Sequence, residues 1–306
     1  MLTARPIPNE KLSSPDFDAA GLEVWVKRLD LVHPEIPGNK FFKLKYNLQK
    51  AVEFGHKQIL TFGGAYSNHI HATAQAAQSL GMNSIGMIRG ELTPPLNPTL
   101  QSASDAGMKL IYLDRSTYRQ KTDPDFLAKL RKEIGQFYLI PEGGTNERAI
   151  QGTQEILSQE DNKFTHLACA IGTGGTFAGI ATGKSDNQEL IGISSLKGAF
   201  IMEDVKNLIL HTASALPPRI HIDTDFHFGG YAKTTPELID FIWDFYTRFG
   251  IPLDPIYTGK MAFAIFKKIK SGYFPAGSKI LLIHTGGLQG NQGFTERTQI
   301  KLPPSA

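Results

Sequence analysis

The chain has 306 residues, a formal net charge of +3 and a single cysteine. Its hydrophobic fraction of 41% is enough to fill complete cores, so the composition excludes a disordered chain. At roughly 150 residues per domain, the length predicts about two domains. The small net charge and the absence of long runs of like charge argue against nucleic acid or an anionic membrane surface as a partner.

The N-terminal segment 1–10 lacks the continuous apolar stretch of a secretion signal. No other segment approaches the roughly 18 apolar residues that a membrane-spanning helix needs. The lone Cys169 cannot form a disulfide within the chain, and its apolar surroundings in the sequence predict a buried thiol. We therefore expect a soluble protein in the reducing cytoplasm.

Short apolar or β-branched runs alternate with longer segments of helical periodicity, which predicts parallel sheets built from βαβ units. The expected strands cover residues 22–30, 58–62, 83–88, 108–113, 137–140, 164–171, 190–194, 219–223 and 279–284. The clearest helices cover residues 67–80, 235–249 and 259–270. Because these strands are too many for one sheet, we expect an α/β fold with two parallel-rich sheets flanked by helices and a ligand-binding cleft between them.

Lys40 follows Gly38 and Asn39 at the point where an expected strand gives way to a helix. Positive charge is disfavoured at a helix N-terminus, so the pKa of Lys40 should be lower than that of a free lysine. An unprotonated lysine amine can form a Schiff base with a carbonyl compound. Taken alone, any lysine is better explained as a solvated surface charge, so the hypothesis for Lys40 depends on the motifs around it.

Three glycine-rich turns, at residues 63–68, 172–176 and 284–290, each follow an expected strand. The second turn opens a helix, where glycines permit close approach to a phosphate and threonine hydroxyls add donors. Its residues are Gly172, Thr173, Gly174, Gly175 and Thr176. A dinucleotide fingerprint fails here at Phe177 and a Walker A motif fails at Ala178, and a tight turn without a ligand is the remaining alternative.

Six motifs in one order, spread from about residue 21 to 290, together resemble the D-cysteine desulfhydrase and 1-aminocyclopropane-1-carboxylate (ACC) deaminase family. They are Gly38-Asn-Lys-Phe-Phe-Lys-Leu-Lys45, Ser67-Asn-His69, Pro141-Glu-Gly-Gly144, Gly172-Thr-Gly-Gly-Thr176, Pro255-Ile-Tyr-Thr-Gly-Lys260 and His284-Thr-Gly-Gly287. Members of this family are pyridoxal 5′-phosphate (PLP) enzymes of the tryptophan-synthase-β type, called fold type II. The resemblance implies a small amino acid as substrate and a homodimer. It also implies a larger PLP-binding domain of residues 1–44 and 148–306 and a smaller domain of residues 45–147.

The resemblance also assigns roles to residues of the motifs. Lys40 would carry PLP covalently and later move the Cα proton of the substrate. Lys43 would reach the phosphate, which the turn at residues 172–176 would hold. Ser67, Asn68 and His69 would bind the substrate at a helix N-terminus, with Asn68 also beside the 3′-oxygen of PLP.

Two further readings of the same segment concern Ser67 and the histidines. Ser67 can act as an N-cap, alone or in addition to binding a ligand. His69 and His71 are two residues apart, so on a helix they point to different faces, and we expect no metal site.

Tyr231 and Tyr257 match two tyrosines that the family places near the substrate, where a phenol can exchange a proton with a leaving group. Thr258 and Thr285 match positions near the pyridine nitrogen, where the ACC deaminase branch has Glu and Leu. A hydroxyl suits a neutral pyridine, which suffices when a Cα carbanion expels a β-thiol. This favours β-elimination from D-cysteine, with ACC deamination as the alternative.

Two positions depart from the family pattern, since Phe42 and Lys45 stand where Arg and Glu are usual. The segment 184–200 also looks short. These departures leave a third alternative, a PLP-binding protein that has lost catalysis.

Overall fold

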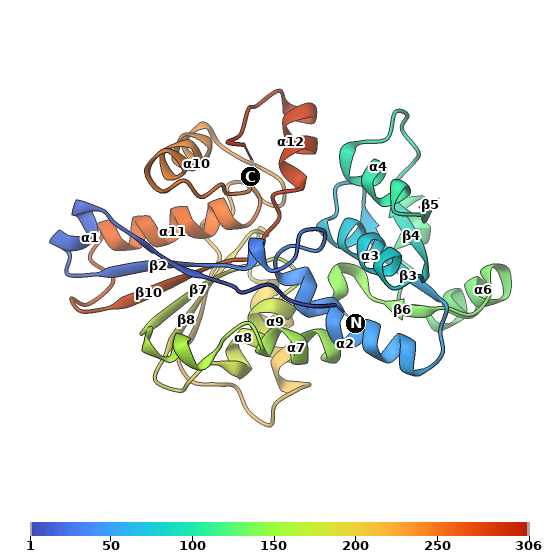
Figure 1. Cartoon of the computed structure of the whole chain (residues 1–306), viewed down its shortest axis with the longest axis horizontal. Coiled ribbons are helices and arrows are strands. Elements are labelled where there is room, and N and C mark those ends of the chain that lie inside the picture. The colour runs from blue at the N-terminus through green and yellow to red at the C-terminus, as the bar shows by residue number, and fades with distance from the viewer. Residues whose placement is uncertain (1, 305–306) are drawn as a thin grey trace.

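The computed structural model describes residues 2–304 and contains two sheets (Figure 1). The larger sheet has the strand order β1-β2-β10-β7-β8-β9. Its strands are β1 (Asn9–Leu12), β2 (Glu23–Arg28), β7 (His166–Ile171), β8 (Glu189–Ser194), β9 (Ile220–Asp223) and β10 (Lys279–His284). Neighbouring strands are parallel except for β1, which is antiparallel to β2.

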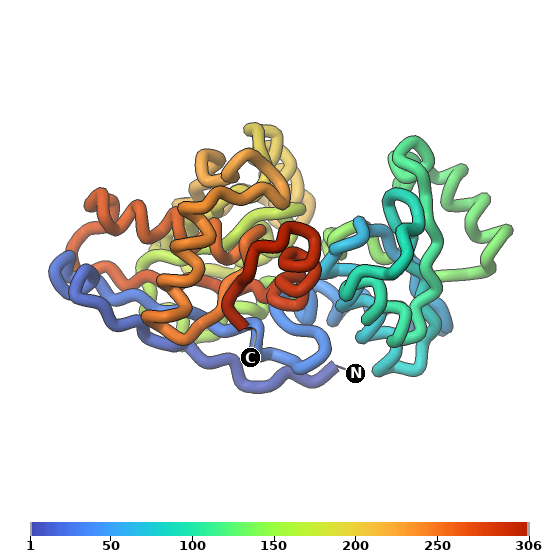
Figure 2. Tube along the Cα trace, turned by 90° about the horizontal axis from the view of Figure 1, so that it is seen from above, coloured from blue at the N-terminus to red at the C-terminus, as the bar shows by residue number. Residues whose placement is uncertain are grey.

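The smaller sheet has the order β5-β4-β3-β6, and all its pairs are parallel. Its strands are β3 (Gln58–Gly64), β4 (Asn83–Arg89), β5 (Met108–Leu113) and β6 (Tyr138–Ile140). The two sheets lie in separate lobes (Figure 1), and Figure 2 shows the red C-terminal segment of the larger lobe facing the smaller lobe. The prediction of two parallel-rich sheets is confirmed.

The α-helices are α1 (Pro15–Ala19), α2 (Asn39–Glu53), α3 (Asn68–Ser79), α4 (Pro98–Asp105), α5 (Arg115–Tyr118), α6 (Pro124–Ile134), α7 (Glu147–Gln154), α8 (Gly175–Gly183), α9 (Phe200–Leu210), α10 (Pro236–Phe249), α11 (Thr258–Lys270) and α12 (Gly290–Thr298). Short 3₁₀ helices cover Leu29–Leu31, Glu142–Gly144 and Gln159–Lys163. Several helices begin at a polar N-cap, as α10 does at Thr235. Within residues 2–304, none of these helices is both long and apolar enough to cross a bilayer.

Strand β7 shows how the larger sheet is buried on both faces. Leu167 and Ile171 belong to a core that includes residues of α2, α7, α8 and α9. Ala168 and Ala170 point to the other face and join a core with residues of α10 and α11. This alternation is typical of a parallel sheet covered by helices on both sides. Cys169 is fully buried, as expected, and burial raises the pKa of its thiol to about 12.

Helix α2 joins the two lobes, because its apolar residues share one core with Ile59 of β3 and Ile140 of β6 as well as with the larger sheet. The predicted domain boundary between residues 44 and 45 falls inside this helix. That boundary, and the one at residues 147 and 148, stay predictions.

Candidate active site

The turn after β10 lies directly against the start of α2, which carries Lys40. The Asn39 N–H donates to the Thr285 carbonyl at 3.0 Å. A Cβ on Gly38 would lie 2.2 Å from that carbonyl oxygen, and Gly38 has a φ of 76°, so only glycine fits both the contact and the backbone. The close approach of these two turns brings Lys40 and Thr285 into one site.

Lys40 is the second residue of α2 and is partly buried. Its Nζ donates to Asn39 Oδ1 at 3.2 Å. Burial lowers the pKa of Lys40 to about 8, and the negative charge of Asp254 opposes this shift. The expected lowering is confirmed, and its main cause is loss of hydration. An appreciable fraction of the amine is therefore unprotonated near neutral pH, as covalent carbonyl chemistry requires.

The turn at residues 172–176 forms the N-terminus of α8, with Gly174 as its N-cap in a left-handed conformation. Thr176 accepts a hydrogen bond from the Asn39 side chain at 2.7 Å, so this turn is tied to the residue beside Lys40. Thr173 lies 2.6 Å from Thr145, a residue that the sequence reasoning missed. The five residues of the predicted phosphate turn thus lie next to the start of α2.

Lys43 extends into the same turn and is almost completely buried. Its Nζ donates to Gly143 O at 2.5 Å, to Thr145 Oγ1 at 2.7 Å and to Thr173 Oγ1 at 3.3 Å. Burial, together with the charge of Lys40, holds its pKa well below the ordinary lysine value.

The surroundings of Lys43 test whether a phosphate group fits this turn. Neither Lys43 nor Lys40 forms an ion pair with a carboxylate in the part of the chain that the structure describes. The N-terminus of α8 adds further positive potential, and a Cβ on Gly175 would lie 3.3 Å from Lys43 Nζ. Two lysine amines without carboxylate partners, beside a glycine-lined turn at a helix N-terminus, form an environment that suits a phosphate dianion. The residues therefore fit the phosphate of PLP.

Ser67 is the N-cap of α3, as one of its predicted roles required. Its hydroxyl oxygen accepts the N–H groups of His69 and Ile70 at 3.2 and 3.4 Å. Two of the amides that we expected to face a substrate anion are therefore already capped. The N–H of Asn68 has no such bond within residues 2–304, and the Ser67 hydroxyl proton is also uncommitted there. These two donors remain for a carboxylate.

Asn68 points across to the C-terminal part of the chain, where its side-chain oxygen accepts a hydrogen bond from Gln289. A Cβ on Gly287 would lie 3.2 Å from Asn68 Nδ2. Asn68 therefore connects α3 of the smaller lobe with the turn after β10.

The His69 side chain is 1% exposed, so its ring does not lie in an open position where it could bind a substrate. The Thr61 hydroxyl donates to Ile140 O at 2.8 Å, so His69 Nε2 must be the donor in its 2.7 Å contact with Thr61. Burial, with the charges of Lys40 and Lys43, holds the pKa of His69 well below its ordinary value. The structure gives no support for a direct contact between this ring and a substrate. His71 instead meets Ser102, so the two histidines diverge as expected.

Asp254, a second residue that the sequence reasoning missed, is 2% exposed and lies in the turn that leads into α11. Its carboxylate accepts the N–H groups of Ile256, Tyr257 and Thr258 at 2.8, 2.7 and 2.9 Å. It also accepts the Thr258 hydroxyl at 2.6 Å. The Asp-Pro pair at 254–255 is a turn signal that could have drawn attention to this residue.

Thr258 is therefore placed differently from the prediction. Its hydroxyl donates to Asp254, accepts the Asp254 N–H at 2.9 Å and is fully buried. Because a hydroxyl has one proton, Thr258 cannot donate to a pyridine nitrogen in this arrangement. Thr285 is the one of the two predicted hydroxyls that makes no side-chain hydrogen bond within residues 2–304.

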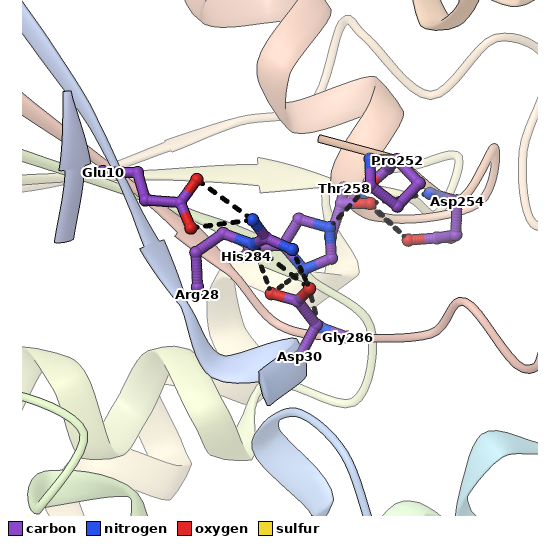
Figure 3. Close-up of polar contacts among 8 residues, drawn as sticks. All are labelled: Glu10, Arg28, Asp30, Pro252, Asp254, Thr258, His284 and Gly286. Carbon is purple, nitrogen blue, oxygen red and sulfur yellow. Dashed lines mark hydrogen bonds and ion pairs between the residues drawn. The ribbon is translucent and has the colours of Figure 1, made fainter. Parts of the chain in front are cut away.

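His284 fixes the position of the turn that carries Thr285 (Figure 3). Its Nε2 donates to Pro252 O at 2.8 Å, and its Nδ1 lies 3.3 Å from Asp30 Oδ1. Asp30 in turn pairs with Arg28 at 2.7 Å, and Arg28 pairs with Glu10 of β1 at 2.9 Å. These polar contacts connect three segments, which are the one after β2, the loop before α11 and the turn after β10.

Tyr231 and Tyr257 lie together, with ring centroids 6.2 Å apart and an interplanar angle of 61°. Tyr231 is 46% exposed, whereas Tyr257 packs against the phosphate turn, where a Cβ on Gly172 would lie 2.9 Å from its ring. Burial and the neighbouring Tyr231 raise the pKa of Tyr257 well above its ordinary value. Its phenol is therefore protonated at neutral pH and can donate a hydrogen bond.

The two unusual residues of α2 have structural explanations. Phe42 is buried and packs edge-on against Phe41 at 5.5 Å. Lys45 lies at the surface and pairs with Glu155. Within residues 2–304, neither side chain forms a hydrogen bond or an ion pair with Lys40 or Lys43.

The chain matches the family model described as "Pyridoxal-phosphate dependent enzyme" over residues 3–286. This chain belongs to the pyridoxal-phosphate dependent enzyme family. It is 33% identical over 281 residues to a putative 1-aminocyclopropane-1-carboxylate deaminase of Pyrococcus horikoshii, covering 88% of this chain and 86% of the relative. It is 31% identical over 298 residues to a mitochondrial bifunctional D-cysteine desulfhydrase/1-aminocyclopropane-1-carboxylate deaminase of Arabidopsis thaliana, covering 88% of this chain and 73% of the relative.

The fold agrees with this membership. The crystal structure of an ACC deaminase homologue superposes with a TM-score of 0.84 at 30% identity, covering 97% of this chain and 94% of that chain. The two-sheet architecture is that of PLP fold type II, and the protein is a PLP-dependent enzyme. The cofactor, fold and family expected from the motifs are confirmed.

Proposed function

We propose that this enzyme is a lyase that converts D-cysteine and water to pyruvate, hydrogen sulfide and ammonia. The observation that carries the proposal is the complete use of the Asp254 carboxylate by three backbone N–H groups and the Thr258 hydroxyl. We therefore assign the neutral hydroxyl of Thr285, rather than a carboxylate, as the partner for the pyridine nitrogen. A hydroxyl supports a weaker electron sink than a carboxylate, which is sufficient for elimination of a β-thiol. The bifunctional Arabidopsis relative bears both activities in its name.

We assign the cofactor to residues of the α2 and α8 N-termini. Lys40 would carry PLP, Lys43 and residues 172–176 would hold its phosphate, and Asn68 would lie on the side of its 3′-oxygen. When bound, PLP supplies the electron sink that makes the Cα proton of an amino acid acidic. The Lys40 amine, with a pKa lowered to about 8, takes that proton from Cα.

The substrate is held and its leaving group protonated by residues around Lys40. The Ser67 hydroxyl and the Asn68 N–H donate to the substrate carboxylate at the N-terminus of α3. The Tyr257 phenol donates a proton to the departing sulfur, and Tyr231 encloses the substrate from the exposed side. The pairing of a base at Cα with an acid at the β-substituent is what an elimination needs.

Product release by the PLP-loaded protein tests this assignment. Pyruvate and sulfide are measured with D-cysteine, L-cysteine and D-serine, and 2-oxobutanoate with ACC. We expect D-cysteine to give the highest kcat/KM. A higher value for ACC would replace the proposal by ACC deamination, which is the second candidate function.

A protein that binds PLP without catalysis is the third candidate. Its sequence support came from Phe42, Lys45 and the short segment 184–200, of which the first two have the structural explanations given above. Absence of product from every substrate tested, with cofactor visibly bound, would favour this candidate.

We also propose that the enzyme is a homodimer in the cytoplasm. The homodimer follows from the family resemblance, and the reduced, buried Cys169 is consistent with a reducing compartment. Light scattering of the PLP-loaded protein tests the first point, since a mass of one chain would contradict it.

A further inference from the structure

Lys260 of α11 is a fully buried lysine that has no place in the chemistry described above. Its side chain is 0% exposed, and its Nζ donates to the carbonyl oxygens of His227 and Gly230, both at 2.9 Å. Both acceptors belong to the segment that leads into Tyr231. A buried ammonium is costly unless its hydrogen bonds are satisfied, so this position is not a simple packing site.

The segment that Lys260 holds has an unusual backbone. Phe228, Gly229, Gly230 and Ala232 all have positive φ, at 52°, 93°, 120° and 56°. Positive φ is unfavourable for phenylalanine and alanine, so surrounding contacts must maintain this conformation. The segment contains no helix or strand, and its local hydrogen bonds include those from the Gly229 N–H to His227 Nδ1 at 2.8 Å and from the Gly230 N–H to the His227 carbonyl at 3.0 Å.

Two kinds of contact attach this segment to α11. Phe228 packs edge-on against Phe263 with ring centroids 5.0 Å apart. Lys260 supplies the polar contact, because its amine bonds the carbonyls at both ends of the turn that begins at His227. Burial lowers the pKa of Lys260 to about 8, and Asp254 opposes this shift.

The same segment determines where the Tyr231 phenol lies. Tyr231 directly follows Gly230, and its ring meets Tyr257 at 6.2 Å. A Cβ on Gly230 would lie 3.6 Å from Lys197 Cβ, so the turn also borders the segment 184–200. Helix α11 carries Lys260 and directly follows Tyr257. Contacts of this one helix can therefore determine the positions of both tyrosines.

We propose that Lys260 is a positioning residue that holds the segment 227–231 in its strained conformation and thereby places Tyr231 against Tyr257 on the substrate side of the site. The catalytic part of this inference depends on the proposed function, because it assigns Tyr231 to the substrate. The structural part does not, because the hydrogen bonds from Lys260 hold the segment whatever the substrate is.

Amide hydrogen exchange of the PLP-loaded protein tests the structural part. Lys260→Met removes the donors while keeping the length of the side chain, and Lys270→Met makes the same chemical change at an exposed position of the same helix. We expect exchange in residues 227–233 to accelerate at least about tenfold in Lys260→Met and to stay unchanged in Lys270→Met. Unchanged exchange in Lys260→Met would overturn the proposal.

If Lys260→Met does not yield folded protein, Lys260→Leu takes its place. Leucine also removes the donors, on a shorter apolar side chain. Faster exchange confined to residues 227–233 supports the proposal, and unchanged exchange there overturns it.

A double-mutant cycle with Tyr231→Ala, which removes the ring that encloses the substrate, tests the catalytic part. We expect Lys260→Met to lower kcat/KM for D-cysteine about tenfold or more while the visible absorbance of bound PLP is retained. In the Tyr231→Ala background the same change should cost less than about twofold, because both substitutions remove the same interaction. Full additivity would overturn the role assigned to Lys260. If the unmodified enzyme gave no product, the proposed function would fail, while the exchange experiment would still decide whether Lys260 holds the segment.

Discussion

The hydroxyl of Thr258 donates to the Asp254 carboxylate at 2.6 Å and accepts the Asp254 backbone N–H at 2.9 Å, in an environment without solvent contact. These two reciprocal hydrogen bonds lie at the N-terminus of α11. They leave the Thr258 hydroxyl proton unavailable to any other acceptor. This arrangement separates the roles of two threonines that the family pattern places together. Thr258 serves the fold, and Thr285 is the one that we assign to the cofactor.

The separation predicts opposite responses to the same substitution. Thr258→Val removes a buried hydrogen bond to a charged group, so the free energy of unfolding should fall by about 1.5–3 kcal/mol. Thr285→Val removes no hydroxyl hydrogen bond within residues 2–304, so its effect should appear in the absorbance of bound PLP instead. Urea unfolding and visible spectra of both variants measure the difference. A stable Thr258→Val with altered absorbance would reverse the two assignments.

Lys43 should contribute to cofactor affinity through the phosphate alone. Lys43→Met should weaken PLP binding roughly tenfold to hundredfold, since a charge-assisted hydrogen bond contributes about 1.5–3 kcal/mol and each 1.4 kcal/mol is tenfold. Binding of pyridoxal, which lacks the phosphate, should not change. Lys45→Met, two residues along at the surface, is the matched control. Equal weakening of PLP and pyridoxal by Lys43→Met would contradict the assignment.

The lowered pKa of Lys40 predicts how the cofactor-free protein captures PLP. Only the unprotonated amine attacks a carbonyl, so the capture rate should rise as the pH passes through about 8. Asp254 raises the pKa of Lys40, so Asp254→Asn should move this midpoint to lower pH. Stopped-flow absorbance measures both profiles. A midpoint near the ordinary lysine value of 10.5 would show that Lys40 is not desolvated.

Asp30 should stabilise the fold in a pH-dependent manner. Burial raises its pKa, but His284 and Arg28 outweigh this effect, so the pKa of Asp30 lies below 3.8. Its stabilising contribution is therefore complete above the unfolded-state pKa and is lost as the pH falls through the lower folded-state value. Asp30→Asn breaks a buried pair, so the free energy of unfolding at neutral pH should fall by about 3–5 kcal/mol.

The outer member of the same network provides the control for Asp30. Glu10 pairs with Arg28 but its side chain is 39% exposed. Glu10→Gln should therefore cost less than about 1 kcal/mol, as is usual for exposed ion pairs. Equal losses from Asp30→Asn and Glu10→Gln in urea unfolding would contradict the importance of burial here.

Local sequence signals predicted most of the fold, because buried parallel strands are continuous apolar runs followed by glycine turns. Strand β1 was missed, since its four residues, Asn9–Leu12, carry no apolar alternation and pair only at the sheet edge. Lys40 and the turn at residues 172–176 could be proposed from the sequence because each motif lies at the start of a helix. Asp254, Lys260 and the inward direction of the His69 ring depend on contacts between distant segments, which spacing in the sequence does not reveal.

The identity of the lysine that carries PLP is the claim on which the account depends most. Borohydride reduction of the PLP-loaded protein fixes the cofactor to its lysine, and peptide mass spectrometry then locates it. Three lysines of the region, Lys40, Lys43 and Lys260, have lowered pKa values, so the experiment offers real alternatives. We expect the label on Lys40, and a label on Lys43 or Lys260 would contradict the assignment of Lys40.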